Sequence, residues 1–391
     1  MYLVGVILFV APLPAAAQIY ELPRPDTSAT QTFGVSVALS GNVAVVGASG
    51  EETCGENAGA AYVYERPDGQ GVWERVARLT PSDCRANAFF GESVDVDGSR
   101  IIVSASSEFF AYEKSNAAYL SARDTSGTWT ETARLTRTVG TDREEGVFAA
   151  GVALDGDRAV VSTSGDVDGA YGGAVYVFDY DAEQDRWRRT ARLTTANGIT
   201  NGVLGGRVDL DGDRIAVAAS TYFDRDPGSV YLFQRDSTSG AWSETARIGD
   251  VRDFFISLDL NGDRLIVGES RAGDDNSGRA TIHRELAPGA WEKVATLRPS
   301  TPYEGGAFGS TVSLDDGWAL VTGYDEQLGQ DFNIDRVVYA FREEEGQWRQ
   351  RTIIDIGEVA FGADIDQEGR TALISSVPET KEGAAYVVRL N

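Results

Sequence analysis

The stretch FGESVDVDGSRIIVSAS, residues 90–106, decides the fold. Its first half alternates polar and apolar residues, which is typical of a strand with one buried face. Its second half is a continuous apolar run, which is typical of a strand buried on both faces. The Asp-Gly pair between the halves favours a tight hairpin turn. The stretch therefore predicts two adjacent antiparallel strands.

The same phrase occurs seven times, at spacings of 50 to 58 residues. A third predicted strand carries a tyrosine in register in six copies, and a fourth begins with a tryptophan in six. Four short antiparallel strands per unit, at a period of about 50 residues, predict an all-β, seven-bladed β-propeller. The first position of the phrase falls at Phe33, Phe90, Phe148, Leu204, Phe254, Phe308 and Phe361; the tyrosines are Tyr62, Tyr119, Tyr176, Tyr231, Tyr339 and Tyr386; the tryptophans are Trp73, Trp129, Trp187, Trp242, Trp291 and Trp348.

The two ends of the chain predict how the ring closes. The seventh copy stops at Asn391 after its third strand, so its fourth strand is missing. The segment from Ile19 to Pro23 precedes the first copy and belongs to none of the seven. Leu22 precedes Phe33 by the same eleven residues that separate Leu79 from Phe90. We therefore expect the N-terminal strand to complete the last blade and to remove an open sheet edge.

Residues 1–17, MYLVGVILFVAPLPAAA, predict a secretory signal peptide that is cleaved before Gln18. A membrane anchor is the alternative, but the apolar run is short and is interrupted by Pro12 and Pro14. The expectation is a single propeller domain, residues 18–391, that is secreted to the extracellular space or the periplasm. We expect no stable membrane insertion after cleavage.

The net charge of the chain limits the kinds of molecule that it can bind. The chain has 35 basic and 60 acidic residues, a net charge of −25. Phosphate-rich partners would be repelled, which excludes nucleic acid and anionic lipid surfaces. Cation binding, a basic partner and adaptation to a salt-rich habitat all remain compatible with this charge.

Cys54 and Cys84 are the only cysteines. They lie in two connections that a propeller places on the same rim, and export favours oxidation, so a disulfide is predicted, with two free thiols as the alternative. The only histidine, His283, takes a position that other copies fill with Val or Leu, and a structural role is expected for it.

Three of the copies, FGVSVALSGNVAVVGAS (33–49), FGESVDVDGSRIIVSAS (90–106) and FGSTVSLDDGWALVTG (308–323), resemble FG-GAP repeats. Such repeats build the propellers of integrin α-chains and also occur in secreted bacterial proteins. The resemblance covers all seven copies, although Phe148-Ala149, Leu204-Gly205 and Phe254-Phe255 depart from the Phe-Gly pattern. It implies recognition or adhesion outside the cell and no shared catalytic activity.

The resemblance also implies calcium in the turn between the first and second strands of a blade. A hard cation suits several converging carboxylates. Here the turns are shorter than the family pattern, and Arg214 and Arg264 follow where a further Asp is expected, so a metal-free Asp-Gly turn is the alternative. The candidate Ca²⁺ ligands are Asp209, Asp211, Asp213, Asp259, Asn261 and Asp263.

The loops between the second and third strands vary most between copies and combine carboxylates with aromatic residues. Binding residues concentrate on loops that a rigid scaffold holds, so these loops predict a rim that binds an extracellular protein or a glycan. The alternative is that the aromatics pack over the blade ends and the carboxylates only solvate the surface. The candidate rim residues are Phe109, Phe110, Tyr112, Asp166, Asp168, Tyr222, Phe223, Asp274 and Asp275.

Catalytic motifs are lacking. The chain contains no HExxH, GxSxG, phosphate-binding loop or Cys-His pair. The segment from Asp124 to Trp129, DTSGTW, resembles the Asp-box of sialidase propellers, but a glycosidase also needs two carboxylates across a pocket, and the sequence singles out no pair. A non-catalytic recognition protein is therefore predicted, with a sialidase-like glycan hydrolase or a structural cell-envelope component as the alternatives.

Overall fold

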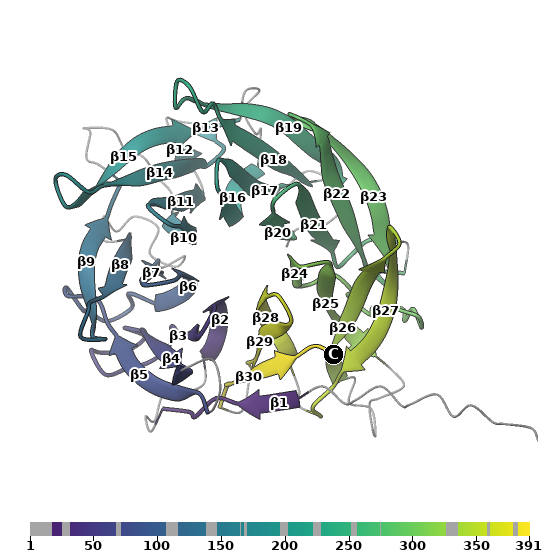
Figure 1. The fold of residues 1–391 in the computed structure, drawn as a ribbon, viewed down its shortest axis with the longest axis horizontal. Helices are drawn as coiled ribbons and strands as arrows, with labels where there is room; N and C mark the ends of the chain where they lie inside the picture. Colours follow the sequence, from purple (N-terminus) through teal and green to yellow (C-terminus); the bar gives the residue numbers. More distant parts are fainter. Residues whose placement is uncertain are drawn as a thin grey trace, which may run out of the picture.

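The computed structural model describes residues 18–25, 32–67, 72–106, 116–137, 147–164, 166–167, 170–195, 202–221, 228–251, 256–273, 275–325, 335–357, 360–377 and 382–391. These residues form seven four-stranded antiparallel sheets. Figure 1 shows the sheets as blades that follow one another around a ring, with the first strand of each blade at the centre. The predicted seven-bladed propeller is confirmed.

Every sheet has the same strand order, from the channel outwards. Blade 1 is β2 (Phe33–Ser40), β3 (Val43–Ala48), β4 (Ala60–Glu65) and β5 (Glu74–Leu79). Blade 2 is β6 (Phe90–Asp97), β7 (Arg100–Ala105), β8 (Ala117–Arg123) and β9 (Trp129–Leu135). Blade 3 is β10 (Val147–Asp155), β11 (Arg158–Ser164), β14 (Ala174–Asp181) and β15 (Arg186–Leu193), with a short ribbon of β12 (Asp166–Val167) and β13 (Ala170–Tyr171).

The remaining blades repeat this order. Blade 4 is β16 (Gly202–Asp211), β17 (Arg214–Thr221), β18 (Gly228–Arg235) and β19 (Trp242–Val251). Blade 5 is β20 (Ser257–Asn261), β21 (Arg264–Glu269), β22 (Arg279–Ala287) and β23 (Ala290–Leu297). Blade 6 is β24 (Val312–Asp315), β25 (Trp318–Asp325), β26 (Asp335–Glu344) and β27 (Gln347–Ile354). Blade 7 is β28 (Phe361–Glu368), β29 (Thr371–Ser376), β30 (Ala384–Arg389) and β1 (Gln18–Glu21).

The N-terminal strand closes the ring, as predicted. β1 pairs antiparallel with β30, from Gln18 opposite Arg389 to Glu21 opposite Tyr386. The amide of Leu22 continues the pairing by donating to the Ala385 carbonyl at 2.8 Å. Leu22 is 1% exposed and packs in the core between blades 7 and 1. The two ends of the chain therefore share one sheet.

The repeated Phe and Tyr residues meet inside the blade interfaces. In five blades the Phe ring of the first strand packs edge-to-face against the Tyr ring of the third, with centroids 5.3 to 5.9 Å apart. In blades 1 to 4 an arginine of the fourth strand lies over that tyrosine; the pairs are Arg75–Tyr62, Arg134–Tyr119, Arg189–Tyr176 and Arg247–Tyr231. These stacks give a structural reason why 32 of the 35 basic residues are arginine.

The glycine of the Phe-Gly pair lets neighbouring blades touch through their backbones. Gly91 has a φ of +96°, and a Cβ there would lie 2.4 Å from the Ala60 carbonyl oxygen of blade 1. Gly47 of blade 1 faces it, and a Cβ on Gly47 would lie 2.0 Å from the Gly91 oxygen. Only glycine fits so close an approach, which explains Gly47, and the positive φ adds a second reason for glycine at Gly91.

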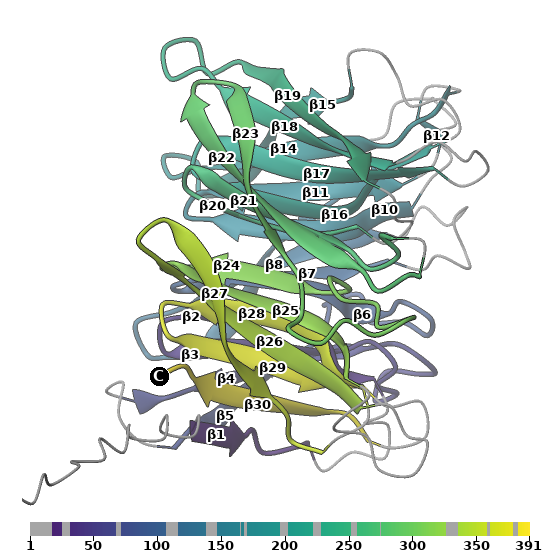
Figure 2. The same ribbon diagram turned by 90° about the vertical axis from the view of Figure 1, so that its right-hand side faces the viewer.

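The antiparallel order divides the connections between two faces. The face with the tight turns between first and second strands and between third and fourth strands is called the turn face. The opposite face, called the loop face, carries the connections from second to third strand and from each blade to the next; Figure 2 shows the ribbon β12 projecting on this side. The described residues contain no helix that is long and apolar enough to span a bilayer.

One detail of the turns differs from the expectation. The Asp-Gly pair does not form the centre of the hairpin, because Asp97 pairs with Arg100 and the two turn residues are Gly98 and Ser99. Asp97 is thus the last residue of its strand. Its side chain is free to reach sideways to the next blade.

Candidate functional site

The carboxylates that end the inner strands join each blade to its neighbour. Asp97 Oδ2 accepts the amide of Gly156 at 2.6 Å, and Asp155 Oδ2 accepts that of Gly212 at 2.5 Å. A side-chain bond spans each of the seven junctions. At five of them a carboxylate accepts a glycine amide, at one the Ser40 hydroxyl accepts the Gly98 amide, and at one Asn261 donates to the Asp315 carboxylate; the five carboxylate pairs are Asp97 with Gly156, Asp155 with Gly212, Asp211 with Gly262, Asp315 with Gly369, and Glu368 with Gly41. This belt of residues is called the turn belt. It includes the junction where the ring closes.

A second set of aspartates lies two residues earlier on four inner strands and is called the aspartate ring. Its members are Asp95, Asp209, Asp259 and Asp366. Each Oδ2 accepts one amide of the next blade, at 2.6 to 2.7 Å, and the donors are Leu154, Leu260, Leu314 and Leu39 in the same order. Asp95 and Asp209 also accept the amide of the residue that follows them. The ring therefore binds backbone of two blades at once.

Burial shifts the pKa values of the aspartate ring. Burial, with a smaller contribution from the charge of Asp209, raises the pKa of Asp95 to about 8. Burial also raises the pKa values of Asp209, Asp259 and Asp366. The ring members raise one another's pKa values, since the Asp209 and Asp366 charges both act on Asp259. Like charges gathered in one channel disfavour full ionisation.

These aspartates line a central cavity of about 620 Å³. The cavity extends from Thr32 and Phe89, where inner strands begin on the loop face, to the aspartate ring. Its described lining also includes Asp364 and Arg207, whose Nη1 lies 3.9 Å from Asp364 Oδ1. Carboxylates and apolar side chains share this lining, which reaches the loop-face ends of the inner strands.

The raised pKa values predict that stability falls as the pH rises from 6 to 9. An unfolded Asp titrates near 3.9, so between that pH and about 8 the native Asp95 holds a proton that the unfolded chain has lost. The stabilising contribution is fully present below the unfolded pKa, is lost at up to about 1.4 kcal/mol per pH unit as the pH rises from there to the native pKa of about 8, and changes no further above it. We expect the melting temperature at constant ionic strength to fall by roughly 3 °C or more.

Two variants show whether the aspartate ring is the source of this dependence. In Asp95→Asn the fall from pH 6 to 9 should shrink. Asp236→Asn is the matched control, because Asp236 lies in an exposed outer turn where hydrogen bonds from Ser239 lower its pKa. A melting temperature that is flat from pH 6 to 9 would rule out the raised pKa values.

The six predicted calcium ligands do not converge. Asp209, Asp211 and Asp259 accept amides of neighbouring blades. Asn261 donates from Nδ2 to Asp315, Asp213 pairs with Arg158 and Arg235, and Asp263 pairs with Arg264 and Arg284. Throughout the described residues, no three Asp, Glu, His or Cys side chains lie close enough to hold one metal ion. Neither the blade 4 turn nor the blade 5 turn therefore gathers its three candidate ligands around one Ca²⁺ in the described residues, and no later step uses calcium.

On the loop face, two of the second-to-third-strand loops are held by the next blade. The carbonyl of Asn57 accepts the Phe89 amide at 3.0 Å, and that of Ala58 accepts the Phe90 amide at 3.1 Å. Blade 5 repeats this arrangement, where Asn276 and Ser277 accept the amides of Ala307 and Phe308; Gly59 and Gly278 complete the parallel ribbons with bridges to Phe90 and Phe308. The loops are thus fixed to the scaffold by backbone bonds.

Each of these loops also begins at a buried ion pair. Glu51 is 1% exposed and pairs with Arg78, while Glu269 is 3% exposed and accepts two bonds from Arg279, at 2.8 and 2.7 Å. Burial alone would raise the pKa of Glu51, but hydrogen bonds from Thr53 and Arg78 outweigh burial and lower it. A buried carboxylate paired with an arginine therefore supports each loop base.

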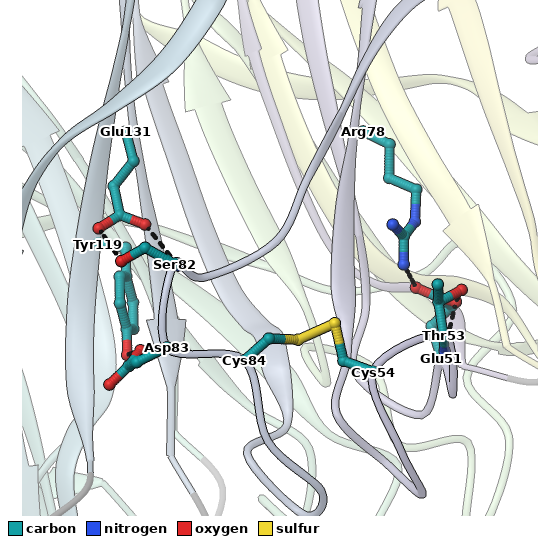
Figure 3. The surroundings of a disulfide bond; sticks show 9 residues. All are labelled: Glu51, Thr53, Cys54, Arg78, Ser82, Asp83, Cys84, Tyr119 and Glu131. Carbon is teal, nitrogen blue, oxygen red and sulfur yellow. Dashed lines mark hydrogen bonds and ion pairs between the residues drawn. A yellow bond between two sulfur atoms is a disulfide. The ribbon is translucent and has the colours of Figure 1, made fainter.

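The predicted disulfide is present on this face. Cys54 and Cys84 are bonded, with their Cα atoms 5.9 Å apart. Figure 3 shows the bond joining the blade 1 loop to the connection that enters blade 2. That connection is itself tied to blade 2, because the Tyr119 hydroxyl donates to Asp83 and the Ser82 amide donates to Glu131 (Figure 3). Blades 1 and 2 are covalently joined at the loop face.

Most of the predicted rim residues lie outside the described residues: Phe109, Phe110, Tyr112, Asp168, Tyr222, Phe223 and Asp274. Asp166 lies in β12, and its backbone alone is described. Asp275 is exposed in the blade 5 loop, where its Oδ1 accepts the Ser277 amide at 3.1 Å and hydrogen bonding lowers its pKa. The rim stays a prediction.

Two further residues have structural roles in the described chain. His283 is 8% exposed and lies 3.1 Å from the Thr281 hydroxyl, and burial lowers its pKa to about 4. Asp124 of the Asp-box-like segment caps its own turn by accepting the amides of Ser126 and Thr128. Neither residue faces the cavity.

A comparison of sequences matches part of the chain to a family of repeats. A model described as "FG-GAP repeat" matches residues 18–64, 73–121 and 129–178, which cover the first three blades. The first three blades therefore match the FG-GAP repeat model, and all seven blades share one propeller fold. No curated protein sequence matches the chain.

Solved structures of similar fold are distant in sequence. A "putative 6-phosphogluconolactonase" from Bacteroides uniformis is 11% identical over 82% of this chain and 85% of its own, with a TM-score of 0.53. A Bacteroides fragilis structure of the same printed name is 12% identical over 83% and 84%, with a TM-score of 0.50. The periplasmic gluconolactonase of Pseudomonas aeruginosa is 16% identical over 82% and 85%, with a TM-score of 0.48. At these identities the likeness shows the propeller fold alone.

Proposed function

We propose that this protein is an exported, non-catalytic recognition propeller that binds an extracellular protein or glycan through its loop face. One observation carries the proposal. The described loops of blades 1 and 5 are held to neighbouring blades by backbone ribbons and buried ion pairs, and a disulfide joins the first of them to the next connection. A preorganised surface binds with a smaller loss of conformational entropy.

The contrast with the turn face supports this choice of surface. There the turns between first and second strands have two residues, and their neighbouring carboxylates are used in the turn belt. The disulfide agrees with an oxidising compartment, as the expected signal peptide does, although residues 1–17 lie outside the described chain. A cell-envelope role would use the same face with a cell-wall polymer as the partner.

The test is binding by protein tethered from opposite faces. Ser99→Cys places a biotin on the turn face, and Glu304→Cys places one on the loop face, in the connection between blades 5 and 6. Both forms would be applied to an array of extracellular polysaccharides and matrix proteins. We expect the Ser99→Cys form to bind and the Glu304→Cys form to lose most of its binding.

The result distinguishes which face of the ring binds a partner from whether the protein binds a partner at all. Equal binding by both tethered forms would place the partner elsewhere on the ring. If neither form binds any polysaccharide or matrix protein, the recognition function fails. Equal melting temperatures of the two variants are the control that the ring is intact.

A glycan or lactone hydrolase is the second candidate, and the cavity favours it. Asp209 and Asp259 interact directly in a cavity where burial raises both pKa values, and a general acid at neutral pH needs such a shift. The test is release of 4-methylumbelliferone from sugar conjugates, and opening of glucono-δ-lactone, because two structures of similar fold carry a lactonase name. Turnover that Asp259→Asn abolishes would establish this candidate. Its absence would leave the binding proposal.

A further inference from the structure

The central cavity has a chemistry of its own, which does not depend on what binds the loops. Six carboxylate side chains line its described part against one guanidinium, that of Arg207: Glu92, Asp95, Asp209, Asp259, Asp364 and Asp366. Each ring aspartate accepts a backbone amide through Oδ2, and Oδ1 of Asp95, Asp209 and Asp366 accepts a second one. A carboxylate has about four acceptor sites, so about two remain on each of these side chains.

A second kind of acceptor in the cavity lining also favours a ligand that donates hydrogen bonds. Ser36 lines the cavity and is 5% exposed, yet its Oγ has no hydrogen-bond partner among the described residues. Its counterparts do have partners, because Ser93 Oγ accepts the Val152 amide and Ser257 Oγ accepts the Val312 amide. The Oγ atom is closed to solvent in this conformation, and turning it towards a hydrogen-bond donor in the cavity would recover the free energy that a buried hydroxyl without a partner costs.

The arrangement of the carboxylates selects the shape of the ligand. They sit on separate blades around the cavity, and among the described residues no three converge on one point that could hold a metal ion. Between them on the inner strands, Val208 is half-buried, while Val94, Val152 and Ile365 pack into the cores between blades. A flexible aliphatic chain with spaced positive charges matches this arrangement, because its charges can meet carboxylates on separate blades while its flexible stem spans the distance between them.

We propose that the central cavity is a binding site for an extended aliphatic polyamine. Its ammonium groups contact members of the aspartate ring one by one and donate to the free acceptor sites. The cavity volume of about 620 Å³ accommodates such a chain, and the lining reaches the loop-face ends of the inner strands.

Protons couple to this binding. The negative charges of Asp97 and Asp211 in the turn belt raise the pKa values of Asp95 and Asp209. The positive charges of Arg207 and Arg336 lower the pKa of Asp364, and the members of the aspartate ring raise one another's pKa values. Burial raises the pKa of Asp95 to about 8, so ammonium groups that enter near neutral pH displace protons from the ring. The affinity should therefore rise between pH 6 and pH 8, and binding should release protons to the buffer.

The test is isothermal titration calorimetry of residues 18–391 with spermidine at pH 7.5 in 150 mM sodium chloride. Repeating it in two buffers of different ionisation enthalpy measures the released protons. We expect one spermidine per chain, weaker binding of 1,5-diaminopentane, and no saturable binding of 1-butylamine. The moderate salt concentration suppresses loose association with a chain of net charge −25.

Substitutions in the cavity lining test the location of the site, and they should change the affinity for spermidine in opposite directions. Asp209→Asn and Asp259→Asn should each weaken spermidine binding about tenfold or more, because each removes a charge-assisted hydrogen bond. Arg207→Gln should tighten binding several-fold, because it removes the one positive charge of the described lining; this side chain is 52% exposed, so the variant should fold normally. The matched controls are Asp124→Asn and Asp236→Asn in exposed outer turns.

Several results would overturn the proposal. Binding of several spermidine molecules per chain that all four Asp→Asn variants weaken equally would show general attraction to an acidic surface. An unchanged affinity in Arg207→Gln, or the absence of saturable binding in the wild-type chain, would exclude the cavity. Arg207→Gln is expected to raise the affinity for spermidine, which a variant that fails to fold cannot do. The test therefore remains valid even if an aspartate variant does not fold.

Discussion

Gly91→Val is expected to destabilise the propeller by about 4 kcal/mol or more, or to prevent folding. Gly91 has a φ of +96°, which a β-branched residue adopts only at high cost, and its Cβ would lie 2.4 Å from the Ala60 carbonyl oxygen. Backbone of two blades meets at this point, so neither side can move without separating the blades. Chemical unfolding of the wild type and the variant measures the difference.

Two further variants control for the loss of glycine itself. Gly91→Ala should fall between the wild type and Gly91→Val, because alanine meets the same clash without the branched side chain. Gly249→Ala in β19 should change stability by less than about 1 kcal/mol, because no heavy atom lies within 4 Å of its Cβ. A Gly91→Val variant as stable as the wild type would show that the blades do not meet as described.

Removal of β1 is expected to have a comparably large effect. A chain that starts at residue 25 loses the strand that pairs with β30 and the Leu22 side chain, which is 1% exposed between blades 7 and 1. It also loses the carbonyl of Pro23, which accepts a hydrogen bond from the Tyr64 hydroxyl at 2.7 Å. We expect the melting temperature to fall by about 10 °C or more, and the exposed β30 edge to cause aggregation.

The comparison is with residues 18–391 and with Leu22→Ala in that chain. The single substitution alone should cost about 2 to 5 kcal/mol, because it leaves a cavity in a tightly packed interface. A synthetic peptide of residues 18–24 should partly restore the truncated ring. Equal melting temperatures for the chains that start at residues 18 and 25 would contradict closure by β1.

The architecture was readable from the sequence because each blade repeats the same local pattern. Phe90 and Tyr119 recur in register, and their rings contact each other within one blade interface, so a repeat in sequence is a repeat in packing. The eleven-residue spacing from Leu22 to Phe33 located the closing strand for the same reason. The pairing of Cys54 with Cys84 followed from topology, since both connections lie on the loop face.

The roles of the carboxylates were not readable in this way. Asp97 and Asp211 look like turn residues in the sequence, yet their partners are amides of the next blade, 51 to 59 residues away along the chain. Only the ring geometry brings those groups together. The cavity residues Asp95, Asp366 and Arg207 were missed as a site for the same reason. Their signal is present, because Asp95, Asp209, Asp259 and Asp366 share one offset from the Phe position of their repeats.

We infer that the acidic residues of the inner strands serve as acceptors between blades and do not act as calcium ligands. A thermal melt of residues 18–391 in calcium chloride and in excess chelator, at matched ionic strength, tests this directly. We expect melting temperatures that agree within about 1 °C in both solutions. Any ligand that binds only the native state raises the melting temperature by mass action. A rise of several degrees that calcium alone produces would contradict this inference and would assign the turn carboxylates to metal.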